Sequence, residues 1–91
     1  MTRLLILIAF AASLANVQRA PARLRALGVT PLSFDLAPTH EPSVIGWMPA
    51  AAVYFRDPDG NLLEYLAMLD SPADPSRGVV SWSEWHAEVE R

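Results

Sequence analysis

The sequence contains no cysteine. This absence excludes a disulfide framework, a thiolate nucleophile and a cysteine-based metal site, and it fits a cytoplasmic protein. Basic residues are also few. Seven Lys and Arg residues stand against ten Asp and Glu residues, for a net charge of −3, so nothing indicates a nucleic-acid-binding surface. The chain further lacks a phosphate-binding glycine loop, a Ser-His-Asp grouping and the spacings of a zinc cluster.

The residues that are present indicate one small domain. The chain has 91 residues, of which 52% are hydrophobic, and this composition is sufficient for a packed core. Neither an internal repeat nor a low-complexity tract interrupts it. We expect a folded module over residues 1–69, followed over residues 70–91 by a Pro-rich linker and a C-terminal tail that contains tryptophan.

The most informative stretch covers residues 50–69 and reads AAAVYFRDPDGNLLEYLAML. Side-chain character alternates on both sides of the DPDG letters, with the period of two that is typical of strands. Pro58 presets φ early in a turn, and Gly60 can adopt a positive φ. We predict an antiparallel hairpin with a four-residue connection, in which Asp57 and Asp59 form the turn and have no catalytic role.

Glu64 is the one ionised group in the second strand of this predicted hairpin. Successive side chains of a strand point to opposite faces of a sheet. If one helix covers the face that carries Leu63 and Tyr65, then Glu64 and Tyr54 share the uncovered face. The apolar side chains on that face need a second layer, and we predict that another copy of the chain supplies it in a homodimer. The alternative is a Glu64 that pairs with an arginine such as Arg56 or is partly solvated.

Residues 1–15 have two interpretations. An aliphatic run follows Arg3, and Ser13-Leu14-Ala15 has the small-x-small form of a signal-peptide cleavage site, which would make the protein secreted. The same run fits a buried first strand, and it is too short to span a membrane as a helix. We favour the strand, because without it the following helix and hairpin would lack a sheet partner.

The middle of the chain alternates between periodic and broken segments. Apolar spacing predicts a helix over residues 14–27 with a kink or a restart at Pro21. Leu32, Phe34 and Leu36 alternate with polar residues and predict a strand over residues 30–36. Three prolines and a glycine predict a long loop over residues 37–49.

The tail carries two tryptophans at helical spacing, Trp82 and Trp85. We predict a short helix that is capped by Ser81 or Ser83. Because tryptophan buries a large apolar area, we expect this helix to dock either on the sheet or on a neighbouring subunit.

The letters VYFRDPDGNLLE at positions 53–64 resemble the closing hairpin of the vicinal oxygen chelate superfamily. That superfamily includes glyoxalase I, extradiol dioxygenases, fosfomycin-resistance transferases and bleomycin-resistance proteins. A weaker resemblance covers the A-F pair at positions 9 and 10, the letters RLRALGV at 23–29 and the strand after Thr30. The resemblance implies an α+β fold consisting of one βαβββ module, of the kind that usually forms the second half of a longer chain, here paired with a second copy.

The resemblance also implies a metal-dependent activity. In the superfamily the last strand supplies a metal-binding glutamate after a D-P-x-G turn, and Glu64 occupies that position. A divalent Zn, Mn, Fe or Ni ion would bind adjacent oxygens of a small substrate as a Lewis acid, in lyase or dioxygenase chemistry. Glu64 would be both metal ligand and catalytic proton shuttle, and His40 is the candidate second ligand. A first-strand histidine is a common partner in the superfamily, but this sequence has Leu7 there, and leucine cannot ligate a metal.

Two other functions are compatible with the same residues. One is a metal-free binding protein, like the superfamily's drug-sequestering members, in which Tyr54, Trp47 and Met48 line an apolar pocket. The other is a truncated module that has no activity of its own. In each case that involves a ligand we expect a small molecule, and we expect neither nucleic acid nor membrane as a partner.

Overall fold

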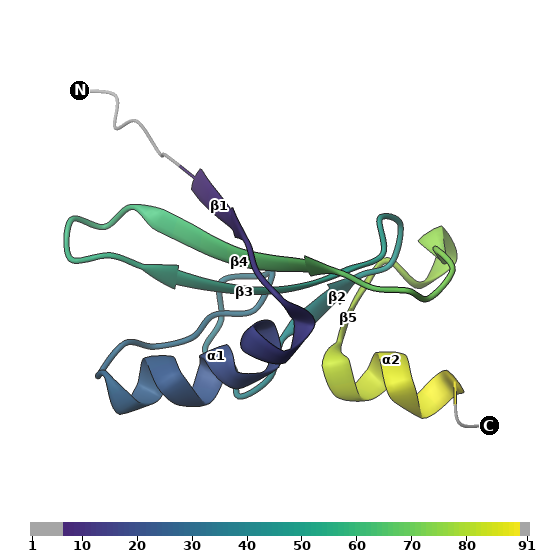
Figure 1. The fold of residues 1–91 in the computed structure, drawn as a ribbon, viewed down its shortest axis with the longest axis horizontal. Coiled ribbons are helices and arrows are strands. Elements are labelled where there is room, and N and C mark those ends of the chain that lie inside the picture. The colour runs from purple at the N-terminus through teal and green to yellow at the C-terminus, as the bar shows by residue number, and fades with distance from the viewer. Residues whose placement is uncertain (1–6, 90–91) are drawn as a thin grey trace.

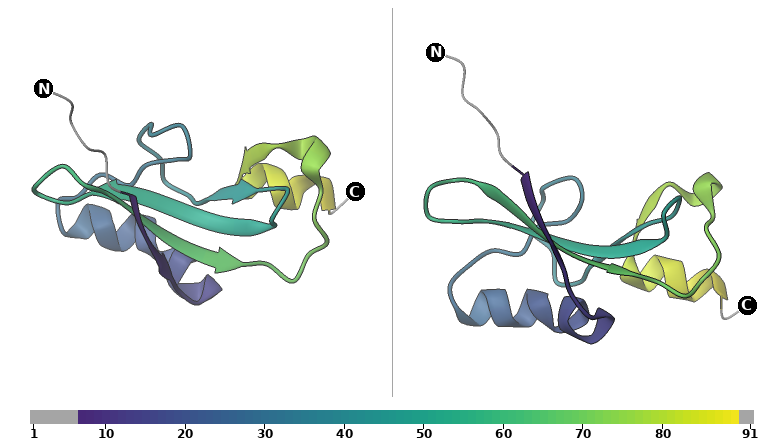
Figure 2. Two further views of the ribbon diagram at one scale, coloured as in Figure 1. Left: turned by 90° about the horizontal axis from the view of Figure 1, so that it is seen from above. Right: turned by 45° about the horizontal axis from the view of Figure 1, so that its top comes forward.

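The computed structural model describes residues 7–89, whose strands form a single five-stranded sheet. The sheet order is β1-β4-β3-β2-β5; β1 is parallel to β4 and the other neighbours are antiparallel. Both helices lie on the same side of this sheet (Figure 1; Figure 2, right). The predicted α+β class and βαβββ order are therefore confirmed. The elements are β1 Leu7–Ala11, α1 Leu14–Ala26, β2 Ser43–Ile45, β3 Ala50–Arg56, β4 Leu62–Met68, the 3-10 turn η1 Pro75–Arg77, β5 Val79–Ser81 and α2 Trp82–Val89.

The hairpin of β3 and β4 forms the centre of the sheet, as predicted. Tyr54 lies opposite Glu64 in its register. The connection covers residues 57–61, one residue more than predicted. Asp57 holds it together, because its Oδ1 accepts the Asn61 N–H at 2.8 Å and its Oδ2 accepts the Asn61 side-chain amide at 3.0 Å. Gly60 has a φ of 86°, which a residue with a Cβ rarely adopts.

Helix α1 covers one face of this hairpin. Ser13 caps it, since the Ser13 Oγ accepts the Asn16 N–H at 3.1 Å. Buried side chains from α1 pack against buried side chains from β3 and β4. Pro21 is buried inside the helix, which runs through it without restarting. The core between α1 and the sheet contains Val17, Ala20, Leu24, Ala51, Val53 and Ala67.

The strand predicted over residues 30–36 is wrong, because only isolated bridges form there. Leu32 bridges Tyr54 and Pro38, and the chain then leaves the sheet at Ser33, whose carbonyl accepts the Leu36 N–H at 2.8 Å. Leu36 has a φ of 63°, which is incompatible with an extended strand. The predicted loop over residues 37–49 is accordingly wrong in part, because the chain returns to the sheet as β2.

The first predicted strand is confirmed as β1, but its side chains are exposed rather than buried. β1 lies at the edge of the sheet and pairs only with β4 among the described residues, so no further strand covers it. The part of the prediction that concerns residues 1–6 lies outside the described residues.

The tail adds to the sheet. β5 pairs with β2. Trp85 of α2 is buried by other residues of the same chain and is only 2% exposed. Gly46 permits this packing, because a Cβ at that position would lie 2.6 Å from the Asp74 carbonyl oxygen. The tryptophan helix thus docks on its own sheet. Neither helix within residues 7–89 has the length and apolar character needed to cross a membrane.

Candidate functional site

Glu64 projects from the middle of β4 on the sheet face opposite α1. We call this surface the Glu64 face; it carries Ala52 and Tyr54 of β3 and Leu62, Glu64, Leu66 and Met68 of β4. The parallel register of β1 places Ala9 beside Glu64 and adds Leu7 to the same face. Despite the absence of a covering helix, Glu64 is only 8% exposed. A carboxylate that is this buried needs a partner for its charge.

Tyr54 is the partner that the hairpin provides. It lies directly across from Glu64 and is 6% exposed. Burial raises the pKa of Tyr54 well above its usual value near 10, and hydrogen bonding to Glu64 together with the negative charge of Glu64 raises it further. Tyr54 therefore remains a neutral hydrogen-bond donor beside the carboxylate throughout the physiological pH range.

No basic side chain within residues 7–89 forms an ion pair with Glu64. The sequence offered Arg56 for this role, but Arg56 donates instead to the Gly60 carbonyl at 3.2 Å and remains exposed. The alternative of a Glu64 paired with Arg56 or partly solvated is thus not what the structure contains. Tyr54 can donate a hydrogen bond to the carboxylate, but it cannot neutralise the charge.

An aromatic group borders the Glu64 face. The Phe34 ring lies 6.2 Å from that of Tyr54 and 6.4 Å from that of Trp47, edge-on to both. Trp47 and Met48, in the turn between β2 and β3, are 51% and 37% exposed. Sequence reasoning named Trp47, Met48 and Tyr54 but missed Phe34, which it assigned to a half-buried strand. The proline-rich neighbourhood of Phe34 is the signal that could have placed it in a loop.

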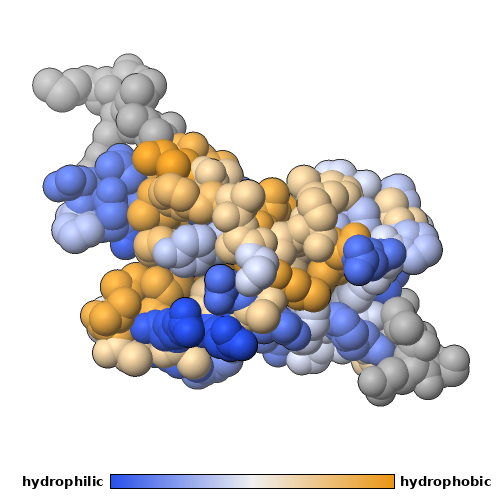
Figure 3. All heavy atoms as spheres, viewed as in Figure 1, coloured by the Kyte–Doolittle hydropathy of each residue, from blue (hydrophilic) through white to orange (hydrophobic). Residues whose placement is uncertain are grey.

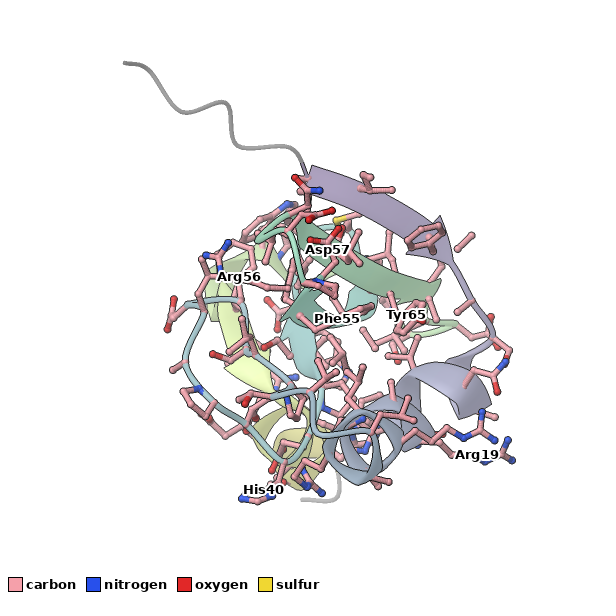
Figure 4. The ribbon with its side chains drawn as sticks, turned by 90° about the vertical axis from the view of Figure 1, so that its left-hand side faces the viewer. Arg19, His40, Phe55, Arg56, Asp57 and Tyr65 are labelled. Atoms are coloured by element: carbon pink, nitrogen blue, oxygen red, sulfur yellow. The ribbon has the colours of Figure 1, made fainter. Side chains whose placement is uncertain are left out.

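The two residues that the sequence offered as metal ligands, Glu64 and His40, do not lie near each other within one chain. His40 is exposed and shares a surface hollow with Arg25 and Gly28 at the end of α1, on the helix side of the sheet (Figure 4). The other histidine of the sequence, His86, stacks on Trp82 in α2, with its Nδ1 2.9 Å from the Trp82 carbonyl. Among the described residues no group of three or more His, Cys, Asp or Glu side chains is placed to hold a metal ion.

Two solved structures have a similar chain path. An integron cassette protein from the mobile metagenome of the Halifax Harbour sewage outfall has a TM-score of 0.58 at 24% identity, over 75% of this chain and 52% of that chain. A glyoxalase/bleomycin resistance protein/dioxygenase from Nocardioides has a TM-score of 0.55 at 29% identity, over 74% of this chain and 40% of that chain. The chain has a vicinal-oxygen-chelate-like fold.

These likenesses establish the fold and leave the activity open. This chain spans about half of the first similar structure and two fifths of the second, so each of them has further chain beyond the shared module. No family model and no curated protein matches the sequence. What the module does therefore has to be inferred from the Glu64 face itself.

Proposed function

We propose that this chain is a small-molecule-binding protein whose ligand lies on the Glu64 face. Glu64 and Tyr54 hold a cationic, hydrogen-bond-donating group of the ligand, and Phe34, Trp47 and Met48 contact its apolar body. The observation that carries this proposal is the Glu64 carboxylate, which is 8% exposed and has no ion-pair partner within residues 7–89.

The charge of Glu64 determines the class of ligand. A buried carboxylate without a counter-charge is destabilising, whereas a bound ammonium group would both neutralise it and donate hydrogen bonds. A hydrogen bond to a charged group typically contributes about 1.5–3 kcal/mol. The exposed aromatic rings beside it favour a flat apolar body that carries the amine. A primary alkylamine that carries a flat aromatic ring is therefore the expected type of ligand.

A second copy of the module would complete the site. Leu7 and Met68 flank Glu64 on the same face and are 54% and 58% exposed, so the face is open in one chain. A twofold partner would cover these side chains and enclose the ligand between two sheets. The proposed binding protein is accordingly a homodimer, in which each Glu64 face is covered by the other chain.

Metal-dependent lyase or dioxygenase chemistry is the second candidate, because the same buried carboxylate would also attract a divalent cation. One chain does not provide the donors. A stable site needs at least three converging ligands, whereas the Glu64 face offers one carboxylate and has Leu7 in place of a histidine. A dimer that brought two Glu64 side chains together would still lack imidazole ligands, so we derive no catalytic step through a metal.

Calorimetric titration separates the two candidates. Tryptamine and its uncharged analogue 3-ethylindole are titrated into wild type, into Glu64→Gln and into Asp59→Asn as the control, whose exposed carboxylate lies in the hairpin turn. The binding proposal expects tryptamine to bind at least tenfold more tightly than 3-ethylindole, and expects Glu64→Gln alone to remove that preference. Equal binding of both compounds contradicts it. Equilibrium dialysis with Mn²⁺ or Zn²⁺ supports the metal candidate only if a stoichiometric ion binds and is lost in Glu64→Ala.

A further inference from the structure

We propose a second ligand site on the opposite side of the sheet, between α1 and β1, for a small amphipathic carboxylate such as a medium-chain fatty acid. It shares no residue with the Glu64 face. A cavity, an uncovered apolar surface and an unpaired basic group coincide there, and the proposed function uses none of them.

The cavity has a volume of about 290 Å³, near the lower limit of small-ligand pockets. Most of its lining comes from one stripe of α1 and its C-cap, where positions 16, 20, 23, 24 and 27 follow helical spacing. Tyr65 of β4 and Ala12, after β1, complete it. The lining residues are Ala12, Asn16, Ala20, Arg23, Leu24, Leu27 and Tyr65.

The apolar wall continues onto β1. Ile8 and Phe10 point to the α1 side of the sheet and are 41% and 46% exposed, because α1 packs on β3 and β4. The Phe10 ring lies 6.1 Å from that of Tyr65, which in turn lies 5.1 Å from that of Phe55. Figure 4 shows Phe55 and Tyr65 between the sheet and α1. An alkyl chain in this cavity would therefore contact aromatic and aliphatic side chains over most of its length.

The charge beside the cavity favours an anion. Helix α1 carries three arginines and no acidic residue, although the whole chain has a net charge of −3. The Arg25 guanidinium donates to the Thr39 carbonyl at 3.4 Å, whereas the Arg23 guanidinium has neither a hydrogen bond nor an ion pair within residues 7–89. Figure 3 shows this hydrophilic strip along α1 directly beneath the apolar surface of the sheet. Arg23 can thus bind a carboxylate whose tail enters the cavity, and the Asn16 amide provides a second donor.

Three compounds test this proposal. Octanoate has both the carboxylate and the alkyl chain, octanol lacks the carboxylate, and acetate lacks the alkyl chain. Titrations followed by amide chemical shifts are expected to show octanoate binding, with the largest shifts in α1 and at Tyr65, and at least tenfold weaker binding of octanol and of acetate. Arg23→Gln should weaken octanoate about tenfold, whereas Arg25→Gln, the matched control on the same helix, should leave the affinity unchanged. Equal affinity for octanoate and octanol, or an equal effect of both arginine variants, overturns the proposal.

A blocking variant and a sedimentation measurement exclude the other occupants. Asn16→Phe places a large side chain at an exposed position of the lining and should abolish octanoate binding while the fold persists. Glu64→Gln should bind octanoate as wild type does, so failure of the proposed function would leave this site intact. If Asn16→Phe instead converts a dimer into monomers, the cavity is a subunit interface and the ligand proposal is wrong.

Discussion

Tyr54 faces Glu64 across the central strand pair, and its ionisation reports directly on the candidate site. Burial raises the pKa of Tyr54, and the hydrogen bond and charge of Glu64 raise it further. Glu64→Gln removes the negative charge, although its amide oxygen can still accept the Tyr54 hydrogen bond. We therefore expect this variant to lower the pKa of Tyr54 while leaving it above the usual value near 10. Carbon-13 NMR of labelled tyrosine in a Tyr65→Phe background measures it; an unchanged pKa would mean that the two side chains do not interact.

The same shift makes folding sensitive to alkaline pH. Because the pKa of Tyr54 is higher in the folded than in the unfolded chain, its stabilising contribution is complete below about pH 10 and is lost as the pH rises through the folded-state value. In urea unfolding experiments, the free energy of unfolding should therefore fall at alkaline pH in wild type and in Asp57→Asn. This fall should be absent from Tyr54→Phe.

The sheet face on which Glu64 and Tyr54 lie was predicted correctly. Alternation along β4 was sufficient to place Glu64 and Tyr54 together on the face opposite α1, because a strand's two faces follow from its period alone. That Glu64 has no ion-pair partner within residues 7–89 could not be predicted from this alternation. Whether Arg56 reaches Glu64 or the Gly60 carbonyl depends on the conformation of the turn, which the pattern of apolar residues does not specify.

The attachment of the tail to the sheet depends on Gly46. A Cβ there would approach the Asp74 carbonyl to 2.6 Å and that of Gly78 to 2.8 Å. We expect Gly46→Ala to destabilise the protein by about 2–3 kcal/mol and to raise amide exchange in β5 and α2. Gly28→Ala is the control. Its φ of 78° is strained but nothing lies within 4 Å, so it should cost about 1 kcal/mol without loosening the tail. Similar exchange in both variants would contradict this account.

Helix α2 has one local cap and one distant cap. The Glu84 N–H donates to the Ser81 Oγ at 3.2 Å, and the Ser83 hydroxyl and N–H donate to Glu41 at 2.7 Å and 2.6 Å. The side-chain hydrogen bond from Ser83, followed by that from its backbone, lowers the pKa of Glu41. Sequence reasoning found Ser81 because capping is local. It could not find Glu41, which comes from a loop 42 residues earlier.

The distant cap should be measurable in acid. Because the pKa of Glu41 is lower in the folded chain, its stabilising contribution is present above the ordinary glutamate pKa near 4.5 and is lost as the pH falls through the folded-state value. Glu41→Gln should cost about 1 kcal/mol at neutral pH and flatten the acid side of the stability profile obtained from urea unfolding. A variant with the wild-type acid profile would show that the Ser83 contacts contribute nothing.

Short elements were the least predictable part of the fold. β2 and β5 each contain three residues and have no period long enough to detect. The alternation at Leu32, Phe34 and Leu36 was misleading because Ser33 begins a turn that takes Phe34 away from the sheet. The long helix and the central hairpin, whose periods extend over several residues, were predicted correctly.

At the scale of the whole molecule, a single chain leaves apolar side chains exposed on the Glu64 face and at the β1 edge of the sheet. The Glu64 face exposes Leu7 and Met68, and β1 lies at the sheet edge with exposed side chains. Exposed apolar surface of this kind favours association. The pairing predicted from the sequence therefore remains the central claim, because the proposed ligand site is incomplete without a second module.

Sedimentation velocity tests that claim most directly, on wild type, Leu7→Glu, Met68→Glu and Leu27→Glu. The first two variants place a charge on the Glu64 face, and the third places one on the opposite side at a position that is 79% exposed. We expect wild type and Leu27→Glu to sediment as dimers at micromolar concentrations, and Leu7→Glu and Met68→Glu to sediment as folded monomers. A folded monomeric wild type, or dimers that persist in both Glu64-face variants, would contradict the account.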